Sequence, residues 1–61
     1  MTPDEARRVL EIEIRKMDAA HSRIVANRDD FKAREEWEAA VTLAHKAQLV
    51  LAEEARAKVA R

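Results

Sequence analysis

The sequence predicts an all-α fold, an antiparallel two-helix hairpin that dimerises into a four-helix bundle. The 61 residues include no glycine and a single proline, Pro3, so little interrupts helix formation. Residues 27–30 (Asn-Arg-Asp-Asp) form the one run in which helix-forming residues give way, and apolar residues recur at helical spacing on both sides of it. We therefore expect one domain over residues 1–61, with helices at about 3–26 and about 30–60 and a turn at 27–30.

The first helix is expected to begin at Pro3. Thr2 suits the N-cap, proline suits the first helical position, and Glu5 stands three residues after the cap, which completes a capping box. The helix is expected to run to about Ala26, because Asn27 tolerates the left-handed conformation with which many helices end.

The second helix is expected to begin with Asp29 or Asp30 as its N-cap. Arg56, Lys58 and Arg61 lie near its C-terminal end, where positive charge complements the helix dipole. One uninterrupted helix of about 58 residues is the alternative, since Asn, Arg and Asp do not forbid helix as Gly or Pro does. The hairpin is favoured because the polar run lies mid-chain and carries a second capping signal.

Each helix has one apolar side on a wheel of about 100° per residue. In the second helix Ala33, Ala40 and Ala47 recur every seven residues, which lets two backbones approach closely, with the first helix or with a second copy as the neighbour. Antiparallel neighbours across a short turn have numbers that add up to about 57, which sets His21 near Trp37. The expected seam of the first helix, spaced by four and three, is Leu10, Ile14, Met17, His21 and Ile24.

A second copy of the chain is expected to cover the remaining apolar surface. Thirteen of the hydrophobic residues are alanine, and a chain of this size rarely builds a sufficient core alone. The apolar arc of the second helix covers about half of the cylinder, too wide for one neighbour. The residues expected in the core of the oligomer are Leu10, Ile14, Met17, Ile24, Trp37, Ala40, Val41, Ala44, Ala47 and Leu51.

The amino-acid composition limits the classes of function that the sequence predicts. Twelve Lys and Arg balance twelve Asp and Glu, so no overall field attracts nucleic acid or anionic lipid, and the absence of cysteine excludes disulfides and thiolate metal sites. No apolar signal region or membrane-spanning run is visible, so we expect a cytoplasmic protein that does not bind membranes.

Catalysis, cofactors and metals are not expected. Asp18 and His21 have the spacing of the Glu-x-x-His element of di-iron bundles, but Trp37, Val41 and Ala44 stand where the facing helix would need carboxylates. A seam histidine packed on Trp37 is the favoured interpretation. No serine, cysteine or lysine is placed beside a histidine and a carboxylate as an activated nucleophile.

Glu13 lies within the apolar arc of the first helix. It is expected either to pair with Lys46, Gln48 or a basic residue of a second copy, and so to fix the register, or to extend to water. Gln48 has the same candidate role. The sequence leaves these alternatives open.

A basic strip on the outer side of the first helix is the candidate partner-binding surface. Its cations flank an isoleucine that lies outside the predicted core. This surface would suit an acidic partner protein or a nucleic-acid backbone. An ordinary solvated face, with Arg8 and Arg15 paired to acids such as Glu11, is the alternative. The strip consists of Arg8, Ile12, Arg15, Lys16 and Arg23.

No motif identifies a family. The layout of about 60 residues, two antiparallel helices and an expected dimer resembles that of Rop, the plasmid RNA-binding four-helix bundle, and this resemblance implies RNA binding through the basic strip. The leading hypothesis is a small non-enzymatic protein-interaction or regulatory module that acts as a helical homodimer. Rop-like nucleic-acid binding is the alternative.

Overall fold

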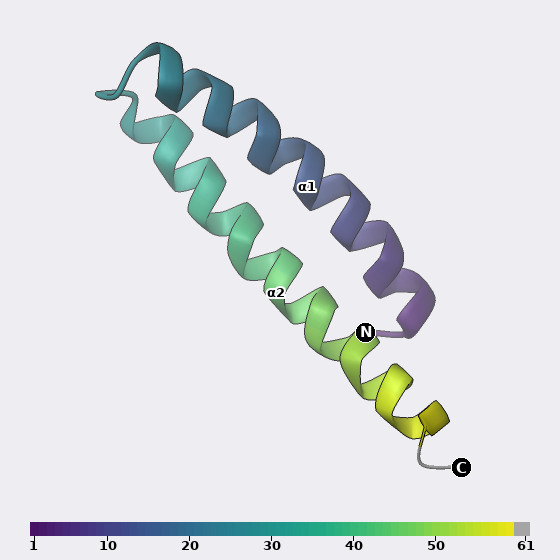
Figure 1. The fold of residues 1–61 in the computed structure, drawn as a ribbon. Helices are drawn as coiled ribbons and strands as arrows, with labels where there is room; N and C mark the ends of the chain where they lie inside the picture. The colour runs from purple at the N-terminus through teal and green to yellow at the C-terminus, as the bar shows by residue number, and fades with distance from the viewer. Residues whose placement is uncertain (60–61) are drawn as a thin grey trace.

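The computed structural model describes residues 1–59 and consists of two antiparallel helices (Figure 1). Helix α1 spans Pro3–Ala26 and helix α2 spans Phe31–Val59, so the hairpin prediction is confirmed and the uninterrupted helix is wrong. The longer α2 extends past the start of α1 (Figure 1). The expected end of the second helix near residue 60, and the charge of Arg61, lie outside the described residues.

The start of α1 follows the predicted capping pattern. The Thr2 hydroxyl accepts a hydrogen bond from the Glu5 backbone N–H at 3.2 Å and satisfies one of the unpaired donors of the first turn. The same hydroxyl donates to Glu5 Oε1 at 3.1 Å. The two side chains together fix the helix start at Pro3.

The turn between the helices differs from the prediction at Asn27. This residue is extended, with φ −149°, rather than left-handed, and no residue within 1–59 has a positive φ. Its side-chain oxygen instead accepts from the Asp29 backbone N–H at 3.1 Å, as in an Asx turn. Asp30, not Asp29, caps α2, because its carboxylate accepts from the Ala33 backbone N–H at 2.9 Å.

The line of contact between the helices is built almost entirely from alanine. Ala33, Ala40 and Ala47 are at most 1% exposed, so the predicted close approach of this alanine series is confirmed, with α1 as the neighbour. A matching series with the same spacing of seven faces it from α1. We call these residues the interhelical seam: Ala6, Glu13 and Ala20 of α1, and Ala33, Ala40 and Ala47 of α2.

The predicted seam of α1 is wrong for the contact within the hairpin. Leu10, Met17 and Ile24 are only half-buried, Ile14 is 46% exposed, and His21 is exposed. Closely approaching backbones leave no room for large side chains on the line of contact, so small residues occupy it and the larger ones lie beside it.

The seam separates two faces of the hairpin. At about 100° per residue, a side chain four residues after a seam position lies on one side of the seam and one three residues after lies on the other. The first set forms the apolar face, with Ile14 and Val41 at its margins: Leu10, Met17, Ile24, Trp37, Ala44 and Leu51. The second set forms the mixed face: Val9, Lys16, Arg23, Glu36, Leu43 and Val50.

Candidate interaction surfaces

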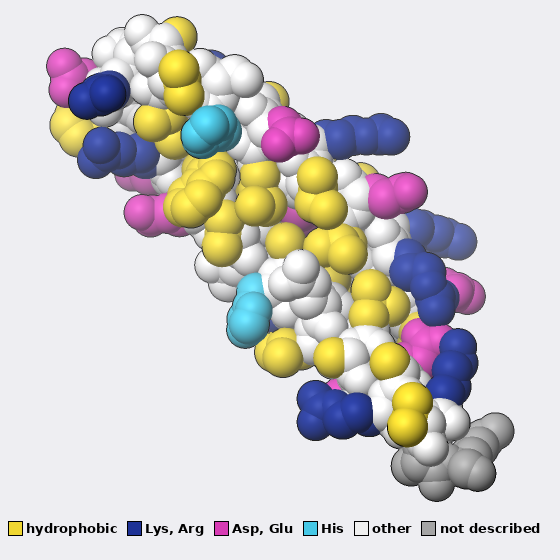
Figure 2. Space-filling model, in the orientation of Figure 1, with side chains coloured by type: hydrophobic (Ala, Val, Ile, Leu, Met, Phe, Trp, Pro, Cys, Tyr) yellow, Lys and Arg dark blue, Asp and Glu magenta, His cyan; other side chains and the backbone are white. Residues whose placement is uncertain are grey.

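The apolar face carries a continuous group of hydrophobic side chains. A band of hydrophobic side chains runs along both helices, with charged side chains at its edges (Figure 2). Trp37 is 37% exposed and Ile14 is 46% exposed, and Leu10, Met17 and Leu51 remain half-buried beside them. Of the residues predicted for the core of an oligomer, only Ala40, Ala44 and Ala47 are buried within the single hairpin.

A hollow on the apolar face confirms the predicted register. His21 and Ile24 of α1 line it together with Trp37 of α2, and its volume is about 330 Å³. His21 therefore lies near Trp37, as expected. An ion pair supports the same register. Arg23, two residues after His21, contacts Glu36, one residue before Trp37.

The basic strip is only partly free. Arg8, Ile12 and Arg15 are exposed, Ile12 by 51%, and neither arginine forms an ion pair within residues 1–59. The other two cations are engaged. Lys16 Nζ lies 3.3 Å from the Glu13 carboxylate, and Arg23 contacts two acids of the turn and of α2. The strip thus reduces to two free arginines around an exposed isoleucine.

Glu13 is the one charged residue of the seam. Its side chain is 7% exposed and pairs with Lys16 one turn later, rather than with Lys46 or Gln48. The alternative in which it extends to water is also wrong. Its position could have been read from the sequence, because Glu13 stands seven residues from both Ala6 and Ala20.

The mixed face carries a second hollow that sequence reasoning missed. Its volume is about 440 Å³, and the alanine pairs Ala19–Ala20 and Ala39–Ala40 form much of its lining. Both pairs stand at the same level of the antiparallel hairpin, so four small side chains leave a space between the helices. The signal was present in the sequence as two Ala-Ala dipeptides in matching register.

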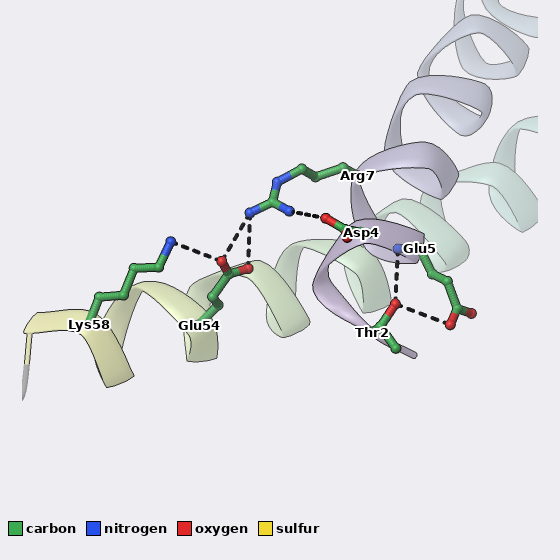
Figure 3. Close-up of polar contacts among 6 residues, drawn as sticks. All are labelled: Thr2, Asp4, Glu5, Arg7, Glu54 and Lys58. Atoms are coloured by element: carbon green, nitrogen blue, oxygen red, sulfur yellow. Dashed lines mark hydrogen bonds and ion pairs between the residues drawn. The ribbon is translucent and has the colours of Figure 1, made fainter.

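At the open end of the hairpin, a network of charges joins α1 to the last turns of α2 (Figure 3). Arg7 donates to both oxygens of Glu54 at 3.0 and 3.1 Å and to Asp4 at 2.8 Å. Lys58 contacts the same Glu54 carboxylate at 3.0 Å. The hydrogen bond from Lys58, with that from Arg7, lowers the pKa of Glu54, while partial desolvation opposes the shift.

Within residues 1–59 no group of three His, Asp or Glu side chains gathers to hold a metal ion, and neither helix combines the length and the apolarity needed to cross a bilayer. No protein-family model, curated protein or solved structure matches the chain, so a functional proposal rests on the two faces and the basic strip.

Proposed function

We propose that this protein is a small non-enzymatic interaction module that acts as a homodimer, with the apolar faces of two hairpins packed together as a four-helix bundle. The observation that carries the proposal is the exposure of Trp37 and Ile14 on the same side of the hairpin as a row of half-buried apolar side chains. Contiguous apolar surface of this kind marks an interaction site in soluble proteins.

Burial within one hairpin supports the need for a second copy. Every buried hydrophobic residue of the described chain is an alanine. An alanine side chain gives little hydrophobic stabilisation, whereas a large one contributes about 1.5–3 kcal/mol when fully buried. The larger residues of the apolar face gain that stabilisation only when another surface covers them.

A second copy offers a matching cover. In a two-fold dimer the same patch faces itself, so an apolar band meets an apolar band of the same length. Antiparallel four-helix bundles pack in this way around a core of large side chains. This proposal assigns Leu10, Ile14, Met17, Ile24, Trp37, Val41 and Leu51 to the bundle core, with Ala40, Ala44 and Ala47 behind them.

The basic strip is the proposed surface for a partner protein. Ile12 stands six residues after Ala6 and thus turns away from the apolar face, so Arg8, Ile12 and Arg15 stay accessible in the bundle. Two free guanidinium groups beside an apolar side chain suit an acidic surface on another protein.

Sedimentation equilibrium over a wide concentration range tests the dimer. Ile14→Lys places a charge in the apolar face, so we expect this variant to sediment as a monomer. Ile12→Lys is the matched control, because Ile12 is exposed to a similar degree, 51% against 46%, but lies outside that face. A wild-type protein that stays monomeric, or equal effects of the two substitutions, would refute the dimer.

Nucleic-acid binding by the same strip is the second candidate, favoured by the two unpaired arginines. It is weakened because Lys16 and Arg23 already hold carboxylates and because the strip has no aromatic side chain for base stacking. A gel-shift titration with duplex RNA at two salt concentrations tests it. Binding that weakens steeply with salt supports this candidate, and the absence of a shift at low salt removes it.

A further inference from the structure

The hollow on the mixed face is not used by the surfaces proposed above. Its volume is about 440 Å³. Five apolar residues and three charged ones line it: Ala19, Ala20, Ala39, Ala40 and Leu43, with Glu13, Lys16 and Glu36. Pockets that take a small molecule or a single inserted side chain have mostly apolar walls and volumes of roughly 300 Å³ or more. The alanine walls therefore suit an aliphatic or planar group.

Two carboxylates, those of Glu13 and Glu36, line this hollow, and Arg23 contacts the second of them. The only hydrogen bond of the Glu13 side chain within residues 1–59 runs from Lys16 to Oε1 at 3.3 Å. No fully buried side-chain oxygen of the described residues lacks a partner, so the unpaired Oε2 of Glu13 must keep some accessible surface. Since a carboxylate offers about four acceptor sites, Oε2 is free to accept from a guest.

Carboxylates outnumber cations around the hollow. Lys16 holds Glu13, while Arg23 is shared between Asp30 and Glu36. Of these residues only Glu13, Glu36 and Lys16 line the hollow, so two carboxylates stand against one cation and the lining has an excess of one negative charge. A guest that carries one positive charge and several N–H donors would balance it.

We propose that this hollow binds the arginine side chain of a partner protein, with the guanidinium donating to Glu13 and the methylene stem against the alanine walls. Arginine fits better than lysine because its planar guanidinium is weakly hydrated, packs on apolar surface and donates two parallel hydrogen bonds to a carboxylate. Only the source of the arginine, a partner protein, rests on the interaction function proposed above. The hollow lies within one hairpin and away from the apolar face, so it stays open in a dimer.

Blocked amino acids test the site without a known partner. N-acetyl-arginine-N-methylamide is titrated into the full ¹⁵N-labelled chain, and the backbone amides of Ala19, Ala20, Ala39 and Ala40 are followed by NMR. We expect saturable shifts at these residues. The citrulline analogue, which has nearly the same shape but no charge, is expected to bind at least about tenfold more weakly, as for the loss of one buried charge-assisted hydrogen bond.

Glu13→Gln removes one of the two negative charges that line the hollow, the one proposed to contact the guest, and is expected to abolish the preference for arginine over citrulline. Glu11→Gln is the matched control, since it removes one negative charge from an exposed position of the same helix. Unchanged arginine binding in Glu13→Gln, equal affinity for the two probes, or the absence of saturable shifts overturns the proposal.

A second variant guards against an effect of Glu13→Gln on folding. Ala39 is exposed, so Ala39→Leu fills the hollow from outside the seam and is expected to abolish binding without loss of helix content by circular dichroism. Binding that survives Ala39→Leu overturns the proposal as well. Sedimentation of the same samples keeps the two proposals apart, because a monomer that still binds arginine refutes only the dimer, and a dimer that does not bind it refutes only the arginine site.

Discussion

Arg7 and Glu54 lie 47 positions apart in the sequence, yet two hydrogen bonds of 3.0 and 3.1 Å join them across the open end of the hairpin. The turn joins the helices at the other end, so among the described residues this pair is the polar contact between the two helices that lies farthest from the turn. Its side chains are partly exposed, which limits the contribution of the pair to stability. The pair instead specifies the register of the two helices, because Arg7 reaches Glu54 only when the helices keep their present alignment.

Acid is expected to weaken this end of the hairpin. The pKa of Glu54 is lowered in the folded protein, so the stability that its charge provides is fully present above the ordinary value of 4.5 and is lost as the pH falls through the folded value. Glu54→Gln should lower the melting temperature at pH 7 and make it less dependent on pH between about 7 and 3. Glu53→Gln, at an exposed neighbouring position, is the control, and parallel curves for wild type and Glu54→Gln would contradict this prediction.

Ala40→Leu is expected to disrupt the close contact of the helices. Ala40 is 1% exposed in the seam, so a larger side chain must push the backbones apart, at a cost of about 1–3 kcal/mol in the free energy of unfolding. The neighbouring exposed position offers a control, since Ala39→Leu should change stability by no more than about 0.5 kcal/mol. Urea unfolding followed by circular dichroism at a single protein concentration measures both values, and similar effects would show that the seam is not tightly packed.

Asp30→Ala is expected to destabilise α2 by about 1 kcal/mol through loss of its N-cap, with a further small loss from the contact with Arg23 at 3.4 Å. Asp30→Asn separates the two effects, because asparagine keeps the cap and removes the charge. Asp29→Ala should have little effect on the thermal melt. Greater sensitivity at Asp29 than at Asp30 would mean that the cap is wrongly assigned.

Trp37 reports on the proposed dimer directly because it is the only tryptophan of the chain. It is 37% exposed in the hairpin alone, so its fluorescence should shift to shorter wavelength as protein concentration rises and the apolar face becomes covered. The Ile14→Lys variant should keep the long-wavelength emission at every concentration.

Trp37→Ala is expected to cost about 3–5 kcal/mol in the free energy of unfolding if a second copy buries the ring, and thermal unfolding that does not change would place Trp37 outside the core.

Local chemistry in the sequence was sufficient to predict the two helices. Thr2, Pro3 and Asp30 act on neighbouring backbone groups, so their effect does not depend on the rest of the fold. The alanine series of the second helix likewise predicted a close contact, since its spacing of seven persists whatever lies opposite. Asn27 shows the limit of such reasoning, because an extended backbone with an Asx turn served the helix end as well as a left-handed residue would have.

Tertiary structure decided which side chains of α1 meet α2. On a wheel the large residues Leu10, Met17 and Ile24 define the apolar side, but the alanines of α2 bring the backbones so close that Ala6, Glu13 and Ala20 take the line of contact. The distance between the two helices has two consequences. It displaces the large side chains to the apolar face, and it leaves a hollow between the small side chains of the mixed face. No property of a single helix sets that distance. The sequence by itself therefore determined the two helices and their caps, and packing between the helices determined which side chains form each surface.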